Sequence, residues 1–307
     1  MILKILCLLA ITPIFASQSA VTYDFSGGRF GDCLLTYLHA KWLSYQYQIP
    51  LHYKPFKYSS DLCLDEKEIR YGTTPGYITA ELGKRGVNEP NPEKRLLYIC
   101  PYFSEDPVDA MQHPSQYRFA IDKKDKNFQK IARAMIAPKR PLSLTEPPKH
   151  TINIAIHIRE GGGYDTDHTR TYDPLKLPPH EFYIEGLLKI LDHFKDKPIY
   201  CYLFTDALQP ETLARKFQEA IPFGTPITLD YRKTNNHHAA NVLEDFFSLF
   251  NFDILIRPFS NYSVVASMIH DYAMVYSPTN SQRVGTKITI TQTNLEIDQE
   301  LYQELLK

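Results

Sequence analysis

The chain has 307 residues, of which 43% are hydrophobic and 22% are charged, and this composition is typical of a globular protein with a sizeable core. Its 34 basic and 35 acidic residues give a formal net charge of −1. A charge so balanced provides no overall field that would draw the chain to nucleic acid or to an anionic membrane. A bound anion must therefore be held by a local cluster of charges.

The first twenty residues, MILKILCLLAITPIFASQSA, predict a secretory signal peptide. Lys4 precedes an apolar run that ends at Ala16, and Ser17 and Ser19 follow at the −3/−1 spacing of a cleavage site. The run is shorter than the ~20 apolar residues that span a bilayer, and an uncleaved anchor is the alternative. We expect a mature chain without a membrane span, located in the secretory pathway, in a periplasm or outside the cell.

Removal of this leader takes Cys7 away and leaves Cys33, Cys63, Cys100 and Cys201. Four cysteines allow three pairings, and an exported chain could form two disulfides. None of the four has the spacing of a zinc site. Cys201 lies inside an apolar strand pattern, which favours a buried thiol.

The first half of the mature chain begins with a short strand that runs into a glycine turn and then a helix with an apolar face. The patterns are weaker after residue 57, and the proline-rich residues 137–150 mark a domain boundary near residue 148. Strands are expected at 21–28, 49–56 and 95–100, and helices at 32–48 and 127–137.

The second half alternates strands with helices throughout. Strands are expected at 151–159, 198–206, 227–231, 252–258 and 272–278, and helices at 180–194, 210–221, 241–251 and 261–270. This alternation predicts crossover connections and a parallel sheet. We therefore expect an α/β protein with two open domains that face each other, residues 21–148 and residues 149–307.

In parallel sheets, ligands bind beyond the carboxyl ends of the strands. At one such end, Arg159 is followed by Gly161 and Gly162 in the sequence HIREGGG. A guanidinium beside open backbone amides suits a diphosphate, because it binds phosphate oxygens in a bidentate manner and keeps its proton. A tight turn with Arg159 in a surface ion pair is the alternative.

Two more strand ends carry polar side chains. Ser260 and Ser263 fall at the start of a predicted helix, where an anion is favoured, although one of them could simply be an N-cap. Asp206 ends another strand and could accept hydrogen bonds from a base or a ribose, or cap a helix. Asn261 begins a glycosylation sequon, but at a phosphate-binding loop we expect it to be unmodified.

Two patterns could suggest a metal, and neither predicts one. Asp165 and Asp167 are spaced to hold a divalent cation, but that spacing is common in polar loops and Arg159 already provides positive charge. The neighbouring His237 and His238 point in different directions on either a helix or a strand. We expect no metal and no cofactor.

Four motifs in order resemble those of the alpha-1,2-fucosyltransferases. These motifs are GGRFGDCLLTYLHAKWLSYQYQIPL, IHIREGGGYD, LFTD and EDFFSLFNFDILIRPFSNYSVVAS, and they extend from residue 26 to residue 267. The family has two facing Rossmann-like domains, the GT-B arrangement, and uses GDP-fucose without a required metal. The resemblance thus implies an acceptor-side domain at 21–148 and a nucleotide-sugar-binding domain at 149–307.

The resemblance also implies roles for individual residues. Arg159 meets the donor diphosphate with Ser260 and Ser263 nearby, and His157 shapes that loop. Asp206 and Asp245 lie near the nucleoside. The opening loop, with Gly28, Arg29, Gly31 and Asp32, faces the cleft from the other domain, where its bare backbone approaches the sugar or the pyrophosphate.

The function implied is transfer of a sugar, fucose from GDP-fucose, to a hydroxyl of a glycan acceptor with inversion. Glu160 stands where the family has a second arginine, so its carboxylate would weaken the field of Arg159 on a diphosphate. Glu160 and Asp32 are the candidates for the general base. The alternatives are a catalytically inactive, carbohydrate-binding relative and a different enzyme on the same scaffold.

Overall fold

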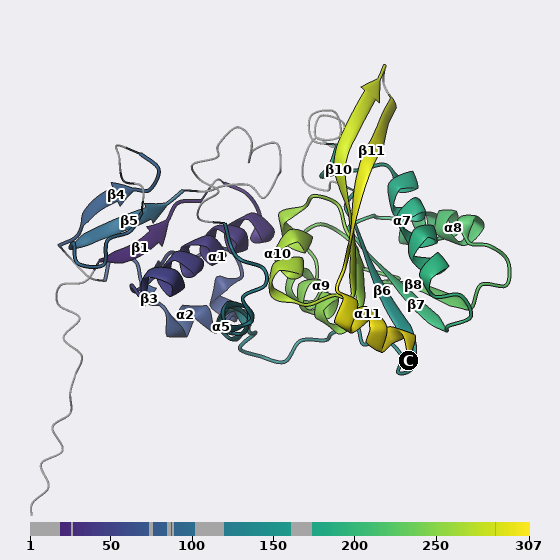
Figure 1. Cartoon of the computed structure of the whole chain (residues 1–307), viewed down its shortest axis with the longest axis horizontal. Helices are drawn as coiled ribbons and strands as arrows, with labels where there is room; N and C mark the ends of the chain where they lie inside the picture. The colour runs from purple at the N-terminus through teal and green to yellow at the C-terminus, as the bar shows by residue number, and fades with distance from the viewer. Residues whose placement is uncertain are drawn as a thin grey trace, which may run out of the picture.

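A computed structural model describes residues 19–25, 27–73, 76–84, 87, 89–101, 120–160, 174–285 and 287–307 (Figure 1). Most of the predicted leader, the two glycines Gly161 and Gly162, and the pair Asp165 and Asp167 lie outside these residues. In the described part of the chain, no helix is long and apolar enough to cross a membrane.

The first half contains a small parallel sheet. Its strands have the order β1-β5-β4, and a bridge between Val21 and Leu51 places a second parallel pair, β2-β3, on the other side of β1. β1 is therefore the topological switch point of this sheet, because β2 and β3 lie on one side of it and β5 and β4 lie on the other. Ligands bind at such points in parallel sheets. The strands are β1 (Ala20–Tyr23), β2 (His52–Tyr53), β3 (Ile69–Arg70), β4 (Ile78–Glu81) and β5 (Leu96–Cys100).

Helix α1 (Phe30–Tyr47) follows β1, in agreement with the prediction, and packs against α10 of the second half (Figure 1). A Cβ atom at Gly31 would lie 2.4 Å from the backbone nitrogen of Tyr262 in α10. Gly31 is thus required where the two helices meet, a reason for bare backbone that was not predicted from the sequence. The remaining helices of this half are the short α2 (Leu64–Lys67), the 3₁₀ turn η1 (Ser59–Asp61) and α5 (Lys126–Ile136).

The second half is built on a six-stranded sheet with the order β11-β10-β9-β6-β7-β8, in which only the β10/β11 pair is antiparallel. The chain runs outward from β6 to β8 and returns to β9 on the other side of β6. The switch point therefore lies between β6 and β9. The strands are β6 (Ile152–Ile158), β7 (Ile199–Thr205), β8 (Ile227–Tyr231), β9 (Ile254–Ile256), β10 (Met274–Val284) and β11 (Lys287–Ile297).

Helices cover both faces of this sheet and form two apolar clusters. One cluster lies under α7 (His180–His193) and α8 (Pro210–Ala220), with the C-terminal α11 (Gln299–Leu306) packed against it. The other lies under α9 (Val242–Ser248), the turn η2 (Leu249–Asn251) and α10 (Asn261–Ile269), and it continues without a break to α1, α5 and β1. The two halves of the chain therefore share one hydrophobic core.

Every strand and helix predicted from the sequence is present, but some strands differ clearly in length. β1 has four residues and β2 has two, where eight were predicted for each. The strand predicted at 272–278 continues as β10 to Val284 and turns back as β11. The β10–β11 ribbon, α2, α11, β3 and β4 were not predicted. β3, β4 and α2 are too short or too polar for a prediction from apolar periodicity. β11 and α11 carry periodic apolar residues, such as Ile288 and Ile290 or Leu301 and Leu305, which were not used in the prediction.

The four cysteines outside the predicted leader are free thiols, so neither of the two possible disulfides forms. Cys100 and Cys201 are buried, and burial raises the pKa of both thiols far above its usual range. The prediction of a buried thiol at Cys201 is confirmed. Cys33 and Cys63 are half-buried.

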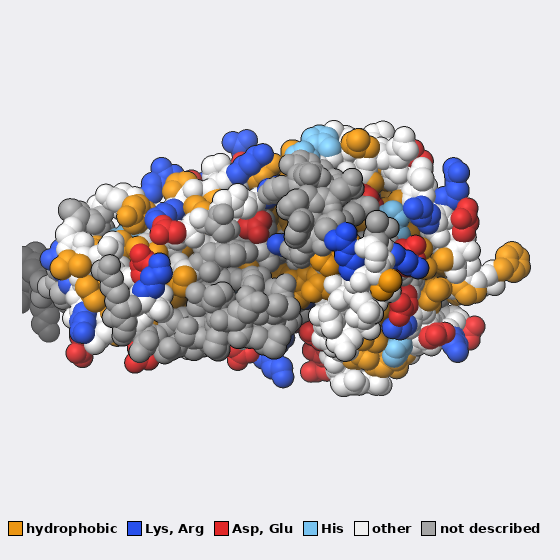
Figure 2. Space-filling view, turned by 90° about the horizontal axis from the view of Figure 1, so that it is seen from above, with side chains coloured by type: hydrophobic (Ala, Val, Ile, Leu, Met, Phe, Trp, Pro, Cys, Tyr) orange, Lys and Arg blue, Asp and Glu red, His pale blue; other side chains and the backbone are white. Residues whose placement is uncertain are grey.

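Charges of both signs are interspersed on the face of the molecule drawn in Figure 2, among scattered hydrophobic side chains. The described Lys and Arg side chains visible on that face form no continuous stripe of the kind that binds nucleic acid. This distribution agrees with the balanced composition of the chain.

Candidate functional site

A cavity of about 680 Å³ lies at the carboxyl ends of β1, β6, β7 and β9, between the two halves of the chain. Both switch points thus open into the same space. Nine of the residues predicted from the sequence line it: Gly28, Arg29, Gly31, Asp32, His157, Arg159, Asp206, Asp245 and Ser260.

The glycine loop before α1 is organised by Asp32. Its Oδ2 atom accepts a hydrogen bond from the backbone N–H of Arg29 at 3.0 Å, and its Oδ1 atom accepts one from Nδ2 of Asn261 in α10 at 2.7 Å. A Cβ atom at Gly28 would lie 2.3 Å from Cγ of Asp32, so the glycine makes room for this carboxylate. Both oxygens of Asp32 thus join the two helix starts, which gives this carboxylate a structural role, and its role as general base stays a prediction.

Asn261 is 5% exposed, and its side-chain amide is the group that binds Asp32. A glycan would need that nitrogen free and accessible. The structure thus agrees with the prediction that the sequon is unmodified.

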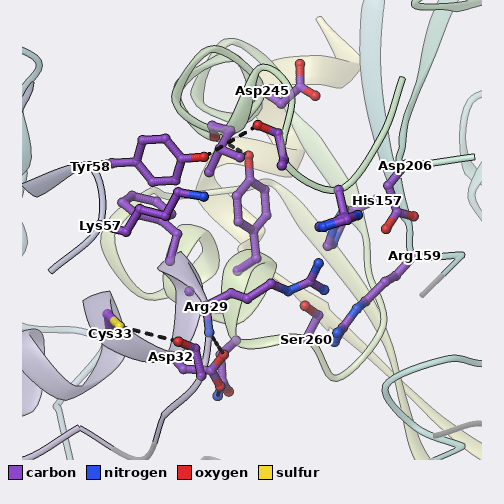
Figure 3. A pocket seen from close by; sticks show the side chains of 18 of the residues that line it. Arg29, Asp32, Cys33, Lys57, Tyr58, His157, Arg159, Asp206, Asp245 and Ser260 are labelled. Atoms are coloured by element: carbon purple, nitrogen blue, oxygen red, sulfur yellow. Dashed lines mark hydrogen bonds between the residues drawn. The ribbon is translucent and has the colours of Figure 1, made fainter. Parts of the chain in front are cut away.

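Two guanidinium groups enter the cavity from opposite sides (Figure 3). Arg29 comes from the start of α1, Arg159 follows β6, and Ser260 lies between them. Ser260 occupies the N-cap position of α10, but its side chain makes no capping hydrogen bond. The interpretation of Ser260 as a simple N-cap is therefore wrong, and the start of α10 presents its hydroxyl and the positive end of the helix dipole to the cavity.

His157 lies on β6 between these cations and α10. Its Nδ1 atom is 2.9 Å from Oγ of Ser263, and its ring packs against Tyr262 with the centroids 5.2 Å apart. Burial, together with the charges of the nearby Arg159, Arg29 and Arg257, lowers the pKa of His157 to about 3. The imidazole is thus neutral near pH 7.

Ser263 is fully buried and does not line the cavity. Its hydroxyl donates to the backbone carbonyl of Ser260 at 3.3 Å, so it can accept a hydrogen bond from Nδ1–H of His157. Because it is buried outside the cavity lining, Ser263 cannot contact a ligand in the cavity directly, and its place near a donor diphosphate stays a prediction. Its side chain orients His157.

The strand ends of β6 and β7 are tied together by Asp206, whose Oδ1 atom accepts a hydrogen bond from the backbone N–H of Glu160 at 2.6 Å. The carboxylate of Glu160 binds Nε2 of His180 at 2.5 Å. Glu160 does not line the cavity. Its carboxylate binds α7, so Glu160 does not face the space where a general base would act, and the predicted weakening of the Arg159 field stays a prediction.

Asp245, in the first turn of α9, closes the end of the cavity near β8. Burial raises the pKa of this carboxyl to about 6, although the adjacent Arg232, which binds it, has the opposite effect. Asp245 is therefore ionised at pH 7 and largely protonated at pH 5.

The wall opposite Asp206 contains residues that were not predicted as ligands. Lys57 and Tyr58 follow β2, and His237 and His238 lie in the loop before α9. The Tyr58 hydroxyl donates to the backbone carbonyl of Ala239 at 3.4 Å, which joins the two loops across the cavity. Lys57 and Tyr58 follow the carboxyl end of a strand, so the rule that identified Arg159 could also have identified them.

Within the described ranges, no three side chains of His, Cys, Asp or Glu are grouped so that they could hold a metal ion. His237 and His238 line the cavity with their rings 6.2 Å apart, and the described residues around them add no such group. Asp165 and Asp167 lie outside the described residues.

The fold of this chain is similar to that of FUT1 and, more distantly, to those of other solved fucosyltransferase structures. A structure of Arabidopsis thaliana FUT1 with GDP is similar over 86% of this chain and 71% of that one, with 13% identity and a TM-score of 0.50. The NodZ fucosyltransferase from Bradyrhizobium matches 92% of this chain and 99% of its own, at 12% identity and a TM-score of 0.46. A structure of POFUT1 with GDP-fucose is similar over 84% of this chain and 95% of that one, with 12% identity and a TM-score of 0.44.

No protein-family model matches the sequence. No curated protein matches it either. At these identities the structural likeness shows a shared fold and assigns no residue a role.

Proposed function

We propose that the chain is a glycosyltransferase that moves fucose from GDP-fucose to a hydroxyl of a glycan acceptor, with inversion at the anomeric carbon. The observation that carries this proposal is the convergence of Arg29, Arg159 and the start of α10 on one cavity at the switch points of two parallel sheets. The similar fold of FUT1, whose structure contains GDP, supports a nucleotide diphosphate as the ligand.

The donor diphosphate would lie between Arg159 and Arg29, with Ser260 and the backbone amides of α10 against its oxygens. A guanidinium matches phosphate oxygens in a bidentate manner, and the dipole of α10 adds positive potential. Lys57 and Lys176 also line the cavity and increase its positive charge. These cations support our proposal that no metal is required for the diphosphate to leave.

The nucleoside would lie toward Asp206, Asp245 and the neutral ring of His157. All three side chains can accept hydrogen bonds, because His157 has a free lone pair at Nε2 when Nδ1 holds the proton. A base with several N–H groups would satisfy them, and guanine has such an edge.

In the transfer step, the acceptor oxygen forms a bond to the anomeric carbon while the bond from that carbon to the diphosphate oxygen breaks. The acceptor proton passes to a base, for which neither Asp32 nor Glu160 is proposed. Arg159 and Arg29 would stabilise the charge that develops on the departing diphosphate. We further propose that residues 21–148 and 149–307 are the two facing Rossmann-like domains of a GT-B arrangement, and that the leader directs the chain into the secretory pathway or out of the cell.

Two measurements test the function. GDP and GDP-fucose should raise the melting temperature of the protein, because a ligand that binds only the native state stabilises it, whereas UDP should do so less. Slow hydrolysis of GDP-fucose without an acceptor should be lost in Arg159→Ala and strongly reduced in Arg159→Lys, which cannot bind in a bidentate manner.

Arg215→Ala is the matched control, since it removes an exposed arginine of α8 far from the cavity lining. Unchanged melting with millimolar GDP, together with no hydrolysis, would contradict the proposal. Binding without any turnover would instead favour an inactive, carbohydrate-binding relative.

A further inference from the structure

β11 is the last strand of the six-stranded sheet, and together with β10 it forms a ribbon that extends well beyond the other strands (Figure 1). Among the strands that the structure describes, none pairs with the outer edge of β11. From Ile288 to Leu295 this strand reads ITITQTNL, without charge, proline or glycine. A long neutral edge with high β propensity offers a row of backbone donors and acceptors, and such an edge is a template for another strand.

A β-bulge in β11 affects which side chains share a face. Asn280 pairs with Gln292 and Ser281 pairs with Ile290, so Thr291 is the extra residue. The half-buried positions therefore change from even to odd numbers, with Ile288 and Ile290 before the bulge and Thr293 and Leu295 after it. All four side chains lie on the same face of the sheet, and the exposed Lys287, Thr289, Asn294 and Glu296 lie on the other.

This arrangement is self-complementary. In a two-fold antiparallel pair, residues that stand opposite each other point to the same face, and the pair must look the same from either strand. A two-fold axis between Thr291 and Gln292 satisfies both conditions. It brings Ile288 opposite Leu295 of the second copy, and Ile290 opposite Thr293.

The same register places Lys287 opposite Glu296 of the second copy, once at each end of the paired segment. A lysine on an edge strand normally opposes pairing with a further strand, because its charge has no partner when the residue opposite it is apolar or basic. Here each lysine meets a carboxylate, and the two ion pairs flank a segment that has no other charge. The charges thus favour one partner, another copy of this chain, and one register.

We propose that the protein forms a dimer through antiparallel pairing of β11 with β11 of a second copy, which joins two six-stranded sheets into one. The cavity lies at the carboxyl ends of β6 and β9, and β10 separates these strands from the free edge of β11. The cavity of each copy therefore stays complete in this dimer. The proposal does not depend on the proposed function.

The test is the molar mass of the full mature chain, measured by light scattering after size exclusion over a range of concentrations. The wild type should be a dimer. Lys287→Glu and Glu296→Lys each place like charges opposite each other twice, and each should weaken the dimer roughly tenfold or more. The double variant restores opposite charges and should recover the dimer.

Arg283→Glu is the matched control, because Arg283 lies on β10 of the same ribbon, opposite Ile288 and away from the free edge. It should leave the dimer intact. Melting curves check that each variant folds. A wild type that is monomeric at every concentration overturns the proposal, as does a dimer that survives both single charge reversals, since that dimer would use another surface.

Discussion

The backbone of Tyr262 lies so close to Gly31 that a Cβ atom at position 31 would be 2.4 Å from the Tyr262 nitrogen and 2.7 Å from its Cα. Both neighbours are backbone atoms, which cannot move aside as a side chain can. The starts of α1 and α10 therefore touch directly, and the hydrogen bond from Asn261 to Asp32 fixes their register. This contact sets the distance between Arg29 on one helix and Ser260 on the other.

Gly31→Ala should force the two helices apart. We expect a loss of about 1–3 kcal/mol in the free energy of unfolding, which is usual for an overpacked core. We also expect weaker nucleotide binding, because Arg29 and Ser260 would no longer face each other at the same distance. Urea unfolding and calorimetric titration with GDP measure the two effects.

Gln46→Ala adds the same residue to an exposed site of the same helix and is the control for helix propensity. It should change neither quantity by much. If Gly31→Ala were as stable as this control, the close contact between α1 and α10 would not exist in solution.

The predicted leader of twenty residues includes Ser19 and Ala20, but their burial in the fold leads us to expect that the mature chain retains both. Both are fully buried, and the Ser19 hydroxyl donates to the carbonyl of Asn91 at 2.7 Å while Ala20 begins β1. A chain that starts at Val21 should lose about 1–3 kcal/mol relative to one that starts at Ser19, because it gives up buried contacts and hydrogen bonds. Intact-mass measurement of the secreted protein gives the cleavage site, and a mature chain that starts at Val21 with unchanged stability would contradict this prediction.

The sequence predicts the second half well for a physical reason. A parallel strand that is covered on both faces must be apolar at almost every position, and β6 and β7 show this in INIAIHI and IYCYLFT. The strand ends and the polar residues that follow them could therefore be located, and Arg159, Asp206 and Ser260 do meet at one cavity.

Side chains that meet only through tertiary contacts could not be predicted in the same way. His238 lies in a loop without periodicity, and it shares the cavity with Tyr58 because the Tyr58 hydroxyl reaches the carbonyl of Ala239, far away in the sequence. The different roles of Ser260 and Ser263 also depend on which face of α10 each occupies. Spacing alone treats the two serines as equivalent.

Acid should destabilise the protein through His157. Its folded pKa is about 3 and its unfolded pKa is about 6.5, so protons bind the unfolded state first as the pH falls. The stability present above pH 6.5 is then lost progressively toward pH 3, by at most ~1.4 kcal/mol per pH unit for one histidine. Urea midpoints between pH 7 and pH 4 measure this slope.

His157→Gln should reduce the slope without removing it, because burial also lowers the pKa of His270, to about 4. The double variant with His270→Gln should be the least sensitive to acid of the three proteins. A slope that is identical in wild type and His157→Gln would show that His157 is not held neutral in the fold.

Nucleotide should protect Cys33 from alkylation. Cys33 lines the cavity, and burial together with the adjacent Asp32 raises the pKa of its thiol to about 11, so alkylation should be slow at pH 7 and accelerate as the pH rises toward 11. GDP should slow this labelling, as measured by peptide mass spectrometry. Cys63, half-buried and outside the cavity lining, is the internal control. Stabilisation by GDP without any protection of Cys33 would place the nucleotide elsewhere.

The affinity for a GDP-sugar should increase between pH 5 and pH 7, because Asp245 titrates near pH 6 and only its ionised form accepts hydrogen bonds at both oxygens. GDP-fucose is a better probe than GDP for this measurement, since its two phosphates are both esterified and do not titrate in this range. Asp245→Asn should bind more weakly at pH 7 and should show little change in affinity with pH. Glu244→Gln, a change to the neighbouring carboxylate outside the cavity lining, should retain the rise in affinity with pH, but at a lower midpoint, because the charge of Glu244 helps to raise the pKa of Asp245. A wild-type affinity that is flat across pH 6 would show that Asp245 does not contact the donor, even if GDP-fucose binds in the cavity.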